Sequence, residues 1–327
     1  MSLLEVQLSV LNVTGNTSLE ELYDIYDGSV VLVILYAPIF LVAVVGNLVV
    51  LLAVLTDRRM RKSSANYFLV NLAIADLLVA LMCIPMTTVY YMYNLWLLGT
   101  TICKATGYLQ GVSIVANVFT IVLMSVDRYF AIRLPLKHRQ VFTVSRVRRL
   151  ILMAWVSAAV IVMPVALVNQ VVRQEFGLHS VHCTEIWPSH VMRQIYDVAM
   201  LVCIYVLPGT AIVVLYTLMG CRLWARDSHL QRQVYDVLVA RRRLALMMII
   251  ISMMFAFCWL PYNIFNICLD FELDAAGQLI TIYPFTILLG HSNSAQNPVL
   301  YWFMHRGFKA FVLKFIKCQC RSFWFRQ

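Results

Sequence analysis

Seven long apolar runs constrain this chain more than any other feature. Each is close to the roughly 20 apolar residues that an α-helix needs to cross a bilayer. They cover residues 30–56, 66–91, 103–127, 150–168, 198–221, 244–269 and 279–304. Of the 327 residues, 61% are hydrophobic and only 13% are charged, whereas soluble domains carry about 25% charged residues. We therefore predict an all-α membrane protein built as a seven-transmembrane helix bundle.

The basic residues predict how this bundle is oriented. All but three of the 26 Lys and Arg residues follow the first, third, fifth or seventh run; the exceptions are Lys104, Arg173 and Arg193. Positively charged loops stay in the cytoplasm, so we expect a multi-pass plasma-membrane protein with an extracellular N-terminus. The start of the chain lacks the features of a cleavable signal peptide. The net charge of +10 then reflects membrane orientation and does not indicate a nucleic-acid partner.

Two segments flank the bundle. We expect residues 1–29 to form an extracellular tail, which carries N-glycosylation sequons at Asn12 and Asn16. Residues 30–304 are expected to form the bundle. Residues 305–327 begin with "HRGFKAFVLKFIKCQC", which predicts a short amphipathic helix lying on membrane lipid. Cys318 and Cys320 after this helix are candidate palmitoylation sites.

Eleven of the 16 acidic residues fall on the predicted outer face, against three basic residues. A concave field of one sign attracts the opposite charge, so a cationic ligand is one explanation and a solvated rim is the other. Cys103 and Cys183 also lie on this face. A disulfide between them is permitted on the oxidising side of the membrane and would hold a loop across the bundle.

Asp76 stands inside the second run, "NLAIADLLVALMCIP". A charge at the centre of a bilayer costs about 2.5–3.5 kcal/mol on insertion scales, so polar partners must face it. Isolated polar residues in other runs are the candidates: Asn47, Ser113, Asn117, Asn293, Ser294 and Asn297. Such a group could bind a sodium ion, or it could serve only as polar contacts between helices.

Several landmarks occur in order along the chain and carry a resemblance. They are Gly46-Asn47, "NLAIAD", Cys103, "DRY" at 127–129, Trp155, Pro208 with Tyr216, "CWLP" at 258–261 and "NPVLY" at 297–301. This pattern resembles the rhodopsin-like class of G-protein-coupled receptors and covers nearly the whole chain. The resemblance implies a receptor and not an enzyme.

The resemblance also implies roles for individual residues. Arg128 would leave Asp127, beside Tyr129, and move toward Tyr216, Tyr301 and a heterotrimeric G protein. Leu136 would contact the G protein, and Phe255 would belong to a packing switch below Trp259. A sodium pocket would comprise Asp76, Asn117, Asn293, Ser294 and Asn297.

The ligand class follows from a narrower resemblance. "YLQGVS", "CTEIWP", "QIYD" and "GCRLW" look most like the neuropeptide FF, RFamide and orexin receptors. This predicts an extracellular neuropeptide ligand with a C-terminal amide near Gln110 and an arginine near Asp270 or Glu185. Trp259, Asn266, Tyr283 and His291 are further candidate ligand contacts.

Two other classes remain as alternatives. An ion- or proton-coupled transporter could also use seven spans and one buried acid, but transporters often show repeats and paired broken helices, which are not evident. A membrane enzyme would need a zinc motif or an activated nucleophile, and neither is evident. No cofactor is expected apart from an allosteric sodium ion. By analogy, we expect a calcium-mobilising G protein first and a cyclic-AMP-lowering one second.

Overall fold

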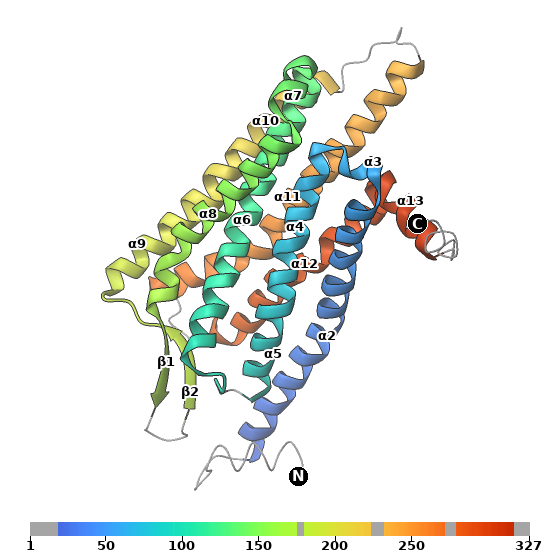
Figure 1. Cartoon of the computed structure of the whole chain (residues 1–327). Coiled ribbons are helices and arrows are strands. Elements are labelled where there is room, and N and C mark those ends of the chain that lie inside the picture. Colours follow the sequence, from blue (N-terminus) through green and yellow to red (C-terminus); the bar gives the residue numbers. More distant parts are fainter. Residues whose placement is uncertain (1–18, 94, 175–179, 224–231, 272–278, 317–327) are drawn as a thin grey trace.

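Long helices lying side by side form the body of the computed structural model, which describes residues 19–93, 95–174, 180–223, 232–271 and 279–316 (Figure 1). Five of the rods are single helices: α2 (Leu19–Thr56), α6 (Gly99–Arg133), α8 (Val144–Val168), α11 (Arg232–Asp270) and α12 (Leu279–Met304). The second and fifth rods are composite: α4 (Ser64–Leu78), η1 (Val79–Cys83) and α5 (Ile84–Tyr93), then α9 (His190–Met200), η2 (Leu201–Val206) and α10 (Leu207–Leu223). The predicted seven-helix membrane bundle is confirmed.

The helices extend beyond the apolar runs that predicted them. Helix α2 begins at Leu19, inside the segment expected to be a tail. Six of the rods are long and apolar enough to cross a membrane within the described residues. The rod α12 is not among the six, because the polar stretch from His291 to Asn297 lowers its hydropathy. It packs against α11 and α2 and completes the bundle.

Two π-helical segments interrupt the composite rods. Segment η1 ends two residues before Pro85, and η2 ends two residues before Pro208. Proline lacks an N–H group and its ring clashes with the preceding turn, so the hydrogen-bond register shifts just before it. Other prolines lie inside α2, α8, α11 and α12: Pro38, Pro164, Pro261, Pro284 and Pro298.

Three short helices lie at one end of the bundle (Figure 1). They are α3 (Arg58–Arg61), α7 (Pro135–Val141) and α13 (Arg306–Ile316). Asp57 caps α3 by accepting a hydrogen bond from the N–H of Arg59 at 2.7 Å, and Pro135 supplies the fixed φ that suits a first helical position. In α13, Phe308 is buried against the bundle while Lys309 and Lys314 are exposed, as the predicted amphipathic pattern requires.

The other end carries a two-stranded antiparallel hairpin. Strand β1 (Asn169–Gln174) pairs with β2 (Ser180–Glu185), with Val171 opposite Cys183. The sequence did not predict this hairpin. We call this end the hairpin end, and the end that carries α3, α7 and α13 the basic end.

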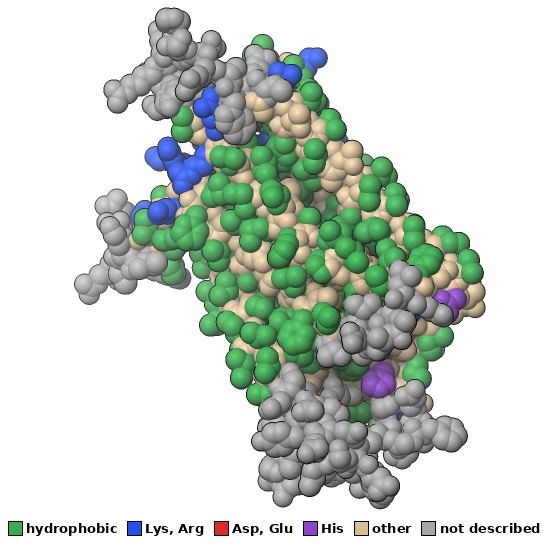
Figure 2. Space-filling view, turned by 180° about the vertical axis from the view of Figure 1, so that it is seen from behind, with side chains coloured by type: hydrophobic (Ala, Val, Ile, Leu, Met, Phe, Trp, Pro, Cys, Tyr) green, Lys and Arg blue, Asp and Glu red, His purple; other side chains and the backbone are tan. Residues whose placement is uncertain are grey.

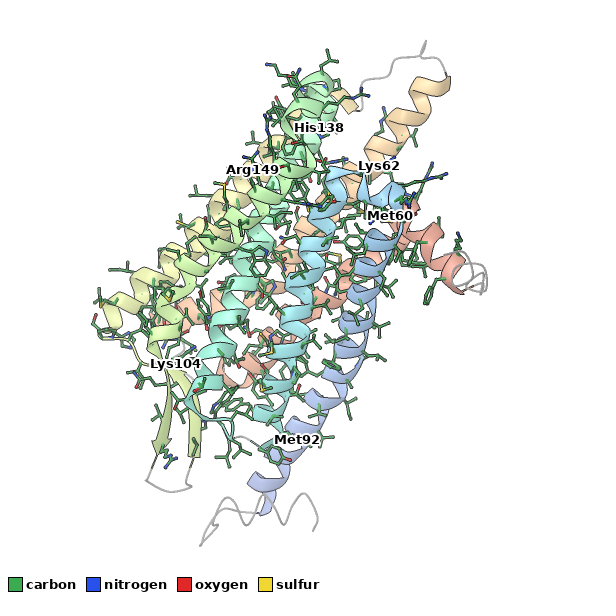
Figure 3. The ribbon with its side chains drawn as sticks, viewed as in Figure 1. Met60, Lys62, Met92, Lys104, His138 and Arg149 are labelled. Atoms are coloured by element: carbon green, nitrogen blue, oxygen red, sulfur yellow. A yellow bond between two sulfur atoms is a disulfide. The ribbon has the colours of Figure 1, made fainter. Side chains whose placement is uncertain are left out.

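The outer surface shows why the bundle needs lipid around it. Hydrophobic side chains cover most of the face in Figure 2, and Lys and Arg side chains gather toward one end. In Figure 3, Lys62 and Arg149 lie at the basic end with His138, whereas Lys104 lies near the hairpin end. Exposed apolar side chains such as Phe257 and Val160 are about two-thirds accessible, which suits contact with hydrocarbon and not with water.

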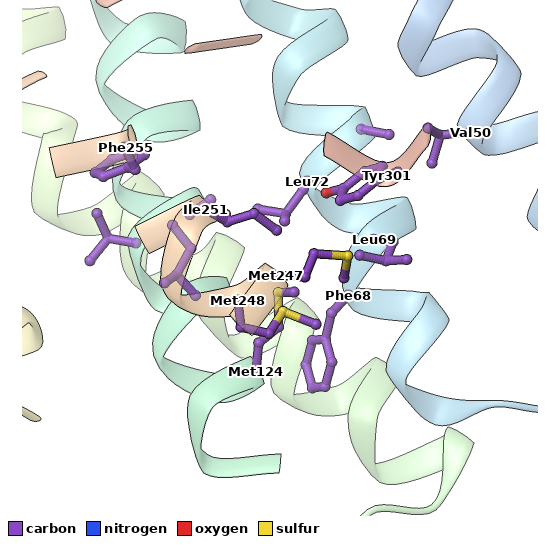
Figure 4. Packing of buried hydrophobic residues seen from close by; sticks show 14 of the residues in the cluster. Val50, Phe68, Leu69, Leu72, Met124, Met247, Met248, Ile251, Phe255 and Tyr301 are labelled. Atoms are coloured by element: carbon purple, nitrogen blue, oxygen red, sulfur yellow. The ribbon is translucent and has the colours of Figure 1, made fainter. Parts of the chain in front are cut away.

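Methionines and aromatic residues fill the core near the basic end. Met124, Met247 and Met248 lie together near Phe68 and Ile251 (Figure 4). Unbranched methionine side chains adapt to irregular gaps, so this part of the core can repack at low cost if the helices shift.

Candidate functional site

A cavity of about 690 Å³ opens among the helices at the hairpin end. Side chains from α5, α6, α8, α9, η2, α11, α12 and both strands line it. Four predicted ligand contacts are among the lining residues: Gln110, Glu185, Asn266 and Tyr283. Aromatic side chains supply much of the remaining wall: Tyr90, Tyr91, Trp96, Tyr196, Tyr205 and Tyr262. The size and the mixture of aromatic and polar walls suit an organic ligand.

The hairpin is fixed against the cavity by a disulfide. Cys103, near the start of α6, is bonded to Cys183 of β2, and their Cα atoms lie 5.7 Å apart. Both cysteines line the cavity. The structure thus contains the predicted disulfide. It places the end of β2, including Glu185, beside the bundle.

Gln110 belongs to a chain of polar contacts across three helices. Its Oε1 lies 3.2 Å from Nε2 of His291 on α12, and Nδ1 of His291 lies 3.2 Å from the Tyr36 hydroxyl on α2. Since an amide oxygen only accepts, Nε2 must donate, and Nδ1 then accepts from Tyr36. The oxygen of the Gln110 amide is thus bound to His291. The NH₂ group of the same amide remains available to the cavity.

The structure places His291 and Trp259 behind the lining and not on it. His291 is 0% exposed and Trp259 is 2% exposed, and their rings meet edge to face at 6.2 Å. Gly290 allows this contact, because a Cβ there would lie 2.6 Å from the Trp259 ring. Neither residue is among those that line the cavity, and a direct contact of either with a ligand stays a prediction.

Asp270 also lies behind the lining, with an internal partner. Its side chain is 1% exposed, and its Oδ1 lies 2.6 Å from Nε of Arg193 on α9. Arg193 and Asp197 line the cavity, but Asp270 does not. The sequence did not reveal the pairing with Arg193, and a contact between Asp270 and a ligand stays a prediction. Glu185 does line the cavity and accepts a hydrogen bond from Trp187 Nε1 at 2.7 Å.

A second polar centre surrounds Asp76 in the middle of the bundle. Asn297 Nδ2 donates to Oδ2 at 2.8 Å, and Asn117 Nδ2 lies 3.4 Å from Oδ1. Ser294 also hydrogen-bonds to the carboxyl group. Asn293 is buried on the same helix, but among the described residues no hydrogen bond joins it to Asp76. Three of the four residues that were predicted to form a sodium pocket with Asp76 therefore contact its carboxyl group.

Asp127 and Arg128 pair at the basic end. The Arg128 Nε donates to Asp127 Oδ2 at 2.9 Å. The other carboxylate oxygen is 2.8 Å from Nε2 of His138 on α7, a contact that the sequence did not reveal. The His138 ring stacks on Phe142 at 5.4 Å. Asp127 therefore holds both Arg128 and the short helix α7.

The other residues predicted for activation lie around this pair. Tyr216 receives a hydrogen bond from Ser125 at 3.2 Å, and Tyr301 is 1% exposed beside Phe308. Tyr129 packs with Ile132, Met219 and Ala245, and Phe255 stacks with Tyr205 at 6.3 Å. Leu136 on α7 is 82% exposed. It is available to a partner at this end.

Trp155 makes a contact that the sequence did not predict. Its Nε1 donates to Asn71 Oδ1 at 2.6 Å, and Asn71 Nδ2 donates to Thr120 Oγ1 at 2.6 Å. These two hydrogen bonds join α8, α4 and α6.

The predicted modification sites Asn12, Asn16, Cys318 and Cys320 lie outside the described residues.

Comparison with known proteins shows which sequences this chain is similar to. The family model "7 transmembrane receptor (rhodopsin family)" matches residues 46–301. The neuropeptide FF receptor 2 of Mus musculus is 32% identical, covering 88% of this chain and 73% of that protein. The neuropeptide FF receptor 1 of Homo sapiens is 31% identical, with 85% and 68% covered. A QRFP-like peptide receptor of Branchiostoma floridae is 28% identical, with 88% and 78% covered.

The landmarks, the seven helices and these matches lead to one assignment. Members of this family are receptors, so the expectation that the chain is not an enzyme is confirmed. The chain belongs to the rhodopsin family of seven-transmembrane receptors, which are multi-pass membrane proteins.

Proposed function

We propose that this receptor binds a C-terminally amidated neuropeptide containing arginine and transmits binding to a heterotrimeric G protein. The observation that carries the proposal is the distribution of polar groups in the cavity. Glu185 and Asp197 line it together with the amide of Gln110. Curated relatives named for neuropeptide FF and for QRFP-like peptides support the same ligand class.

The two kinds of polar group lie at different depths. Gln110 is seven residues beyond Cys103 on α6, which corresponds to about 10 Å at a rise of 1.5 Å per residue. Glu185 lies two residues after Cys183, at the end of β2. A peptide can therefore present its amide to Gln110 while an arginine remains near the hairpin, where a carboxylate forms a charge-assisted pair.

The proposed orientation has an extracellular N-terminus. The basic end would lie in the cytoplasm, because Lys and Arg are retained there, and Lys62 and Arg149 mark this end in Figure 3. The cavity then faces outward, and Leu136 faces the G protein. We propose the calcium-mobilising class as the first partner and the cyclic-AMP-lowering class as the second.

The amide assignment predicts a difference between amidated and free-acid peptides. A panel of amidated RFamide- and orexin-like peptides should activate cells expressing the chain. The free acids should be at least tenfold weaker. A carboxylate has no N–H group to donate to the second lone pair of Gln110 Oε1, whose first lone pair accepts from His291, and it would add a buried charge. Calcium and cyclic-AMP responses provide the readout. Nucleotide exchange on the G protein, compared with solute flux in vesicles, separates this proposal from the transporter alternative.

Gln110→Leu serves as the matched variant for the panel. It should reduce the difference between amide and acid, whereas Arg173→Ala on strand β1 should leave that difference unchanged. Equal potency of amide and acid on the wild-type receptor would exclude the proposed role of Gln110.

We also propose an allosteric sodium ion at Asp76. Three buried oxygens lack hydrogen-bond partners among the described residues. One is Asn117 Oδ1, on a residue that contacts Asp76, another is Asn47 Oδ1, on a residue bonded to the Ser294 backbone, and the third is Ser113 Oγ. Carboxylate, hydroxyl and amide oxygens are ligands that suit a hard cation. The residues therefore fit the ion, which would supply a positive charge to the buried carboxylate.

The sodium proposal predicts salt-specific stability. Replacing potassium chloride by sodium chloride at constant ionic strength should raise the thermal midpoint of the purified receptor. Asp76→Asn should abolish this difference, since a neutral amide cannot balance the ion. Thermal unfolding in both salts measures the effect, and a sodium response that persists in Asp76→Asn would contradict the site.

A further inference from the structure

The imidazole of His138 shares the Asp127 carboxylate with Arg128 at the basic end. His138 Nε2 lies 2.8 Å from Asp127 Oδ1, and Arg128 Nε donates to Asp127 Oδ2 at 2.9 Å. The Asp127 side chain is 1% exposed, so water has little access to its charge. One buried acid therefore serves two basic side chains, one on α6 and one on α7.

This contact determines which ring nitrogen of His138 can change its protonation. A carboxylate that is paired with arginine is ionised and only accepts hydrogen bonds, so Nε2 carries a proton. Nδ1 is then either bare or protonated, and the ring is neutral or positively charged accordingly. Histidine is the side chain that normally changes its charge between about pH 5 and 8. Since the His138 side chain is 21% exposed, protons from solution can reach it.

Phe142 holds the His138 ring in its place. The two rings are stacked with their centroids 5.4 Å apart and their planes 19° apart, and Phe142 is buried. The face of an aromatic ring attracts a cation, so this contact suits the charged imidazole as well as the neutral one. A protonated His138 therefore stays beside Asp127 instead of turning toward water.

Other charged or titratable side chains surround this site on several elements. They are Tyr216 on α10, His305 before α13, Lys137 and Arg139 on α7, and Arg146 on α8. Tyr216 and His305 interact electrostatically with Arg128, and Arg146 donates to the backbone oxygen of Gln140 at 2.6 Å. None of these side chains is a carboxylic acid, so Asp127 is the acid that is paired with His138.

We propose that His138 is a positioning residue through which cytoplasmic acidity controls the release of Arg128. When Nδ1 gains a proton, two cations share one carboxylate in a site that water hardly reaches, and each cation weakens the attraction of the carboxylate for the other. Arg128 then leaves Asp127 more easily, while His138 still holds α7 to the bundle. By linkage, the release of Arg128 must strengthen proton binding by His138 by the same factor.

The consequence for signalling is a coupled state that is favoured at lower cytoplasmic pH. Arg128 is freed for its part in activation, and α7 keeps presenting the exposed Leu136 at the basic end. This consequence rests on the proposed function, because it assumes a G-protein partner. The linkage between His138 and Arg128 does not depend on that partner.

A proton titration of the receptor alone tests the linkage. The full-length receptor is labelled with ¹³C-histidine, its NMR spectra are followed from about pH 5 to 8, and His138→Gln identifies the signal of His138. In Arg128→Met, His138 should bind its proton at a roughly tenfold lower proton concentration than in wild type, because the competing cation is absent. Arg128→Gln repeats the test if the methionine variant does not fold. Arg139→Met removes an exposed cation from the same helix and should change the midpoint by less than about threefold.

Nucleotide exchange on the G protein provides the second readout. The exchange rate at about pH 6.5, divided by the rate at about pH 7.5, should be at least threefold larger for wild type than for His138→Tyr. Tyrosine retains a hydroxyl donor but stays neutral in this range, and the comparison removes the pH dependence of the G protein itself. His305→Asn retains an oxygen that can cap α13 and should show the same pH dependence as wild type.

A His138 signal that does not titrate in this range would overturn the inference. Equal midpoints in wild type and Arg128→Met would overturn it as well, since the two cations would then not compete for Asp127. If the titrations are linked but exchange in wild type and His138→Tyr depends equally on pH, the proposed effect on coupling is excluded. Linked titrations without exchange on any G protein would support the linkage and count against the proposed function.

Discussion

Cys183→Ser is expected to lower the thermal midpoint of the purified receptor by about 7 °C. The disulfide spans 80 residues, and the loop-entropy relation assigns a cross-link of that length about 4.5 kcal/mol. A change of 1 kcal/mol shifts the midpoint by roughly 1.5 °C in a chain of 327 residues. The disulfide also positions β2, so the response to an amidated peptide should fall by at least tenfold. Thermal unfolding and concentration–response curves measure the two effects.

Two controls show whether the disulfide causes these losses. Cys203→Ser changes an exposed free cysteine and should leave both quantities unchanged. Reduction of the wild-type receptor with dithiothreitol should reproduce the loss, while Cys183→Ser should be insensitive to it. A wild-type midpoint that does not change on reduction would show that the hairpin is held by other contacts.

The bundle could be predicted because hydrophobicity is a local property. Each helix packs its apolar run against neighbouring helices or exposes it to lipid. A segment that crosses a bilayer can satisfy its backbone hydrogen bonds only as a helix or as part of a closed barrel. The Asp76 partners could also be predicted, since an isolated polar residue in an apolar run must find another one. Asn117, Ser294 and Asn297 therefore met the expectation.

The contacts that could not be predicted join segments that are distant in the chain. Asp270 has the same residue type and the same helix-end position whether its side chain faces the cavity or the interior. Only the packing of α9 against α11, with Arg193 between them, separates those cases. The contact of His138 with Asp127 depends in the same way on how α7 folds back.

The hairpin and the π segments could not be predicted for other reasons. The sequence "NQVVRQ" of β1 has no regular alternation, and it becomes a strand because β2 pairs with it. The π segments depend on a shift in hydrogen-bond register. Proline signals that helical bonding is lost, but it does not determine which carbonyl takes over.

Leu136→Asp is expected to weaken G-protein activation by about 30-fold or more. Helix α7 holds Leu136 82% exposed, and the contact of His138 with Asp127 at 2.8 Å fixes that helix to the bundle. An isolated receptor gains nothing from an exposed leucine, whereas a partner that buries it gains about 2 kcal/mol, and an aspartate there would oppose the contact. Nucleotide exchange on the G protein, with peptide affinity measured in parallel, separates coupling from ligand binding.

The control for this variant lies on the same helix. Gln140→Asp adds the same negative charge at an exposed position of α7 without removing an apolar side chain, and it should reduce coupling by less than threefold. Leu136→Met retains the apolar contact and should couple almost normally.

If Leu136→Asp coupled as well as Gln140→Asp, the apolar side chain would not be the contact, and the exposed leucine would have to serve another surface. A loss confined to Leu136→Asp, with peptide affinity unchanged, would place the partner directly over α7, where Asp127 binds Arg128 through one oxygen and His138 through the other. Binding of the partner could then act on Arg128 through the same carboxylate that holds the helix.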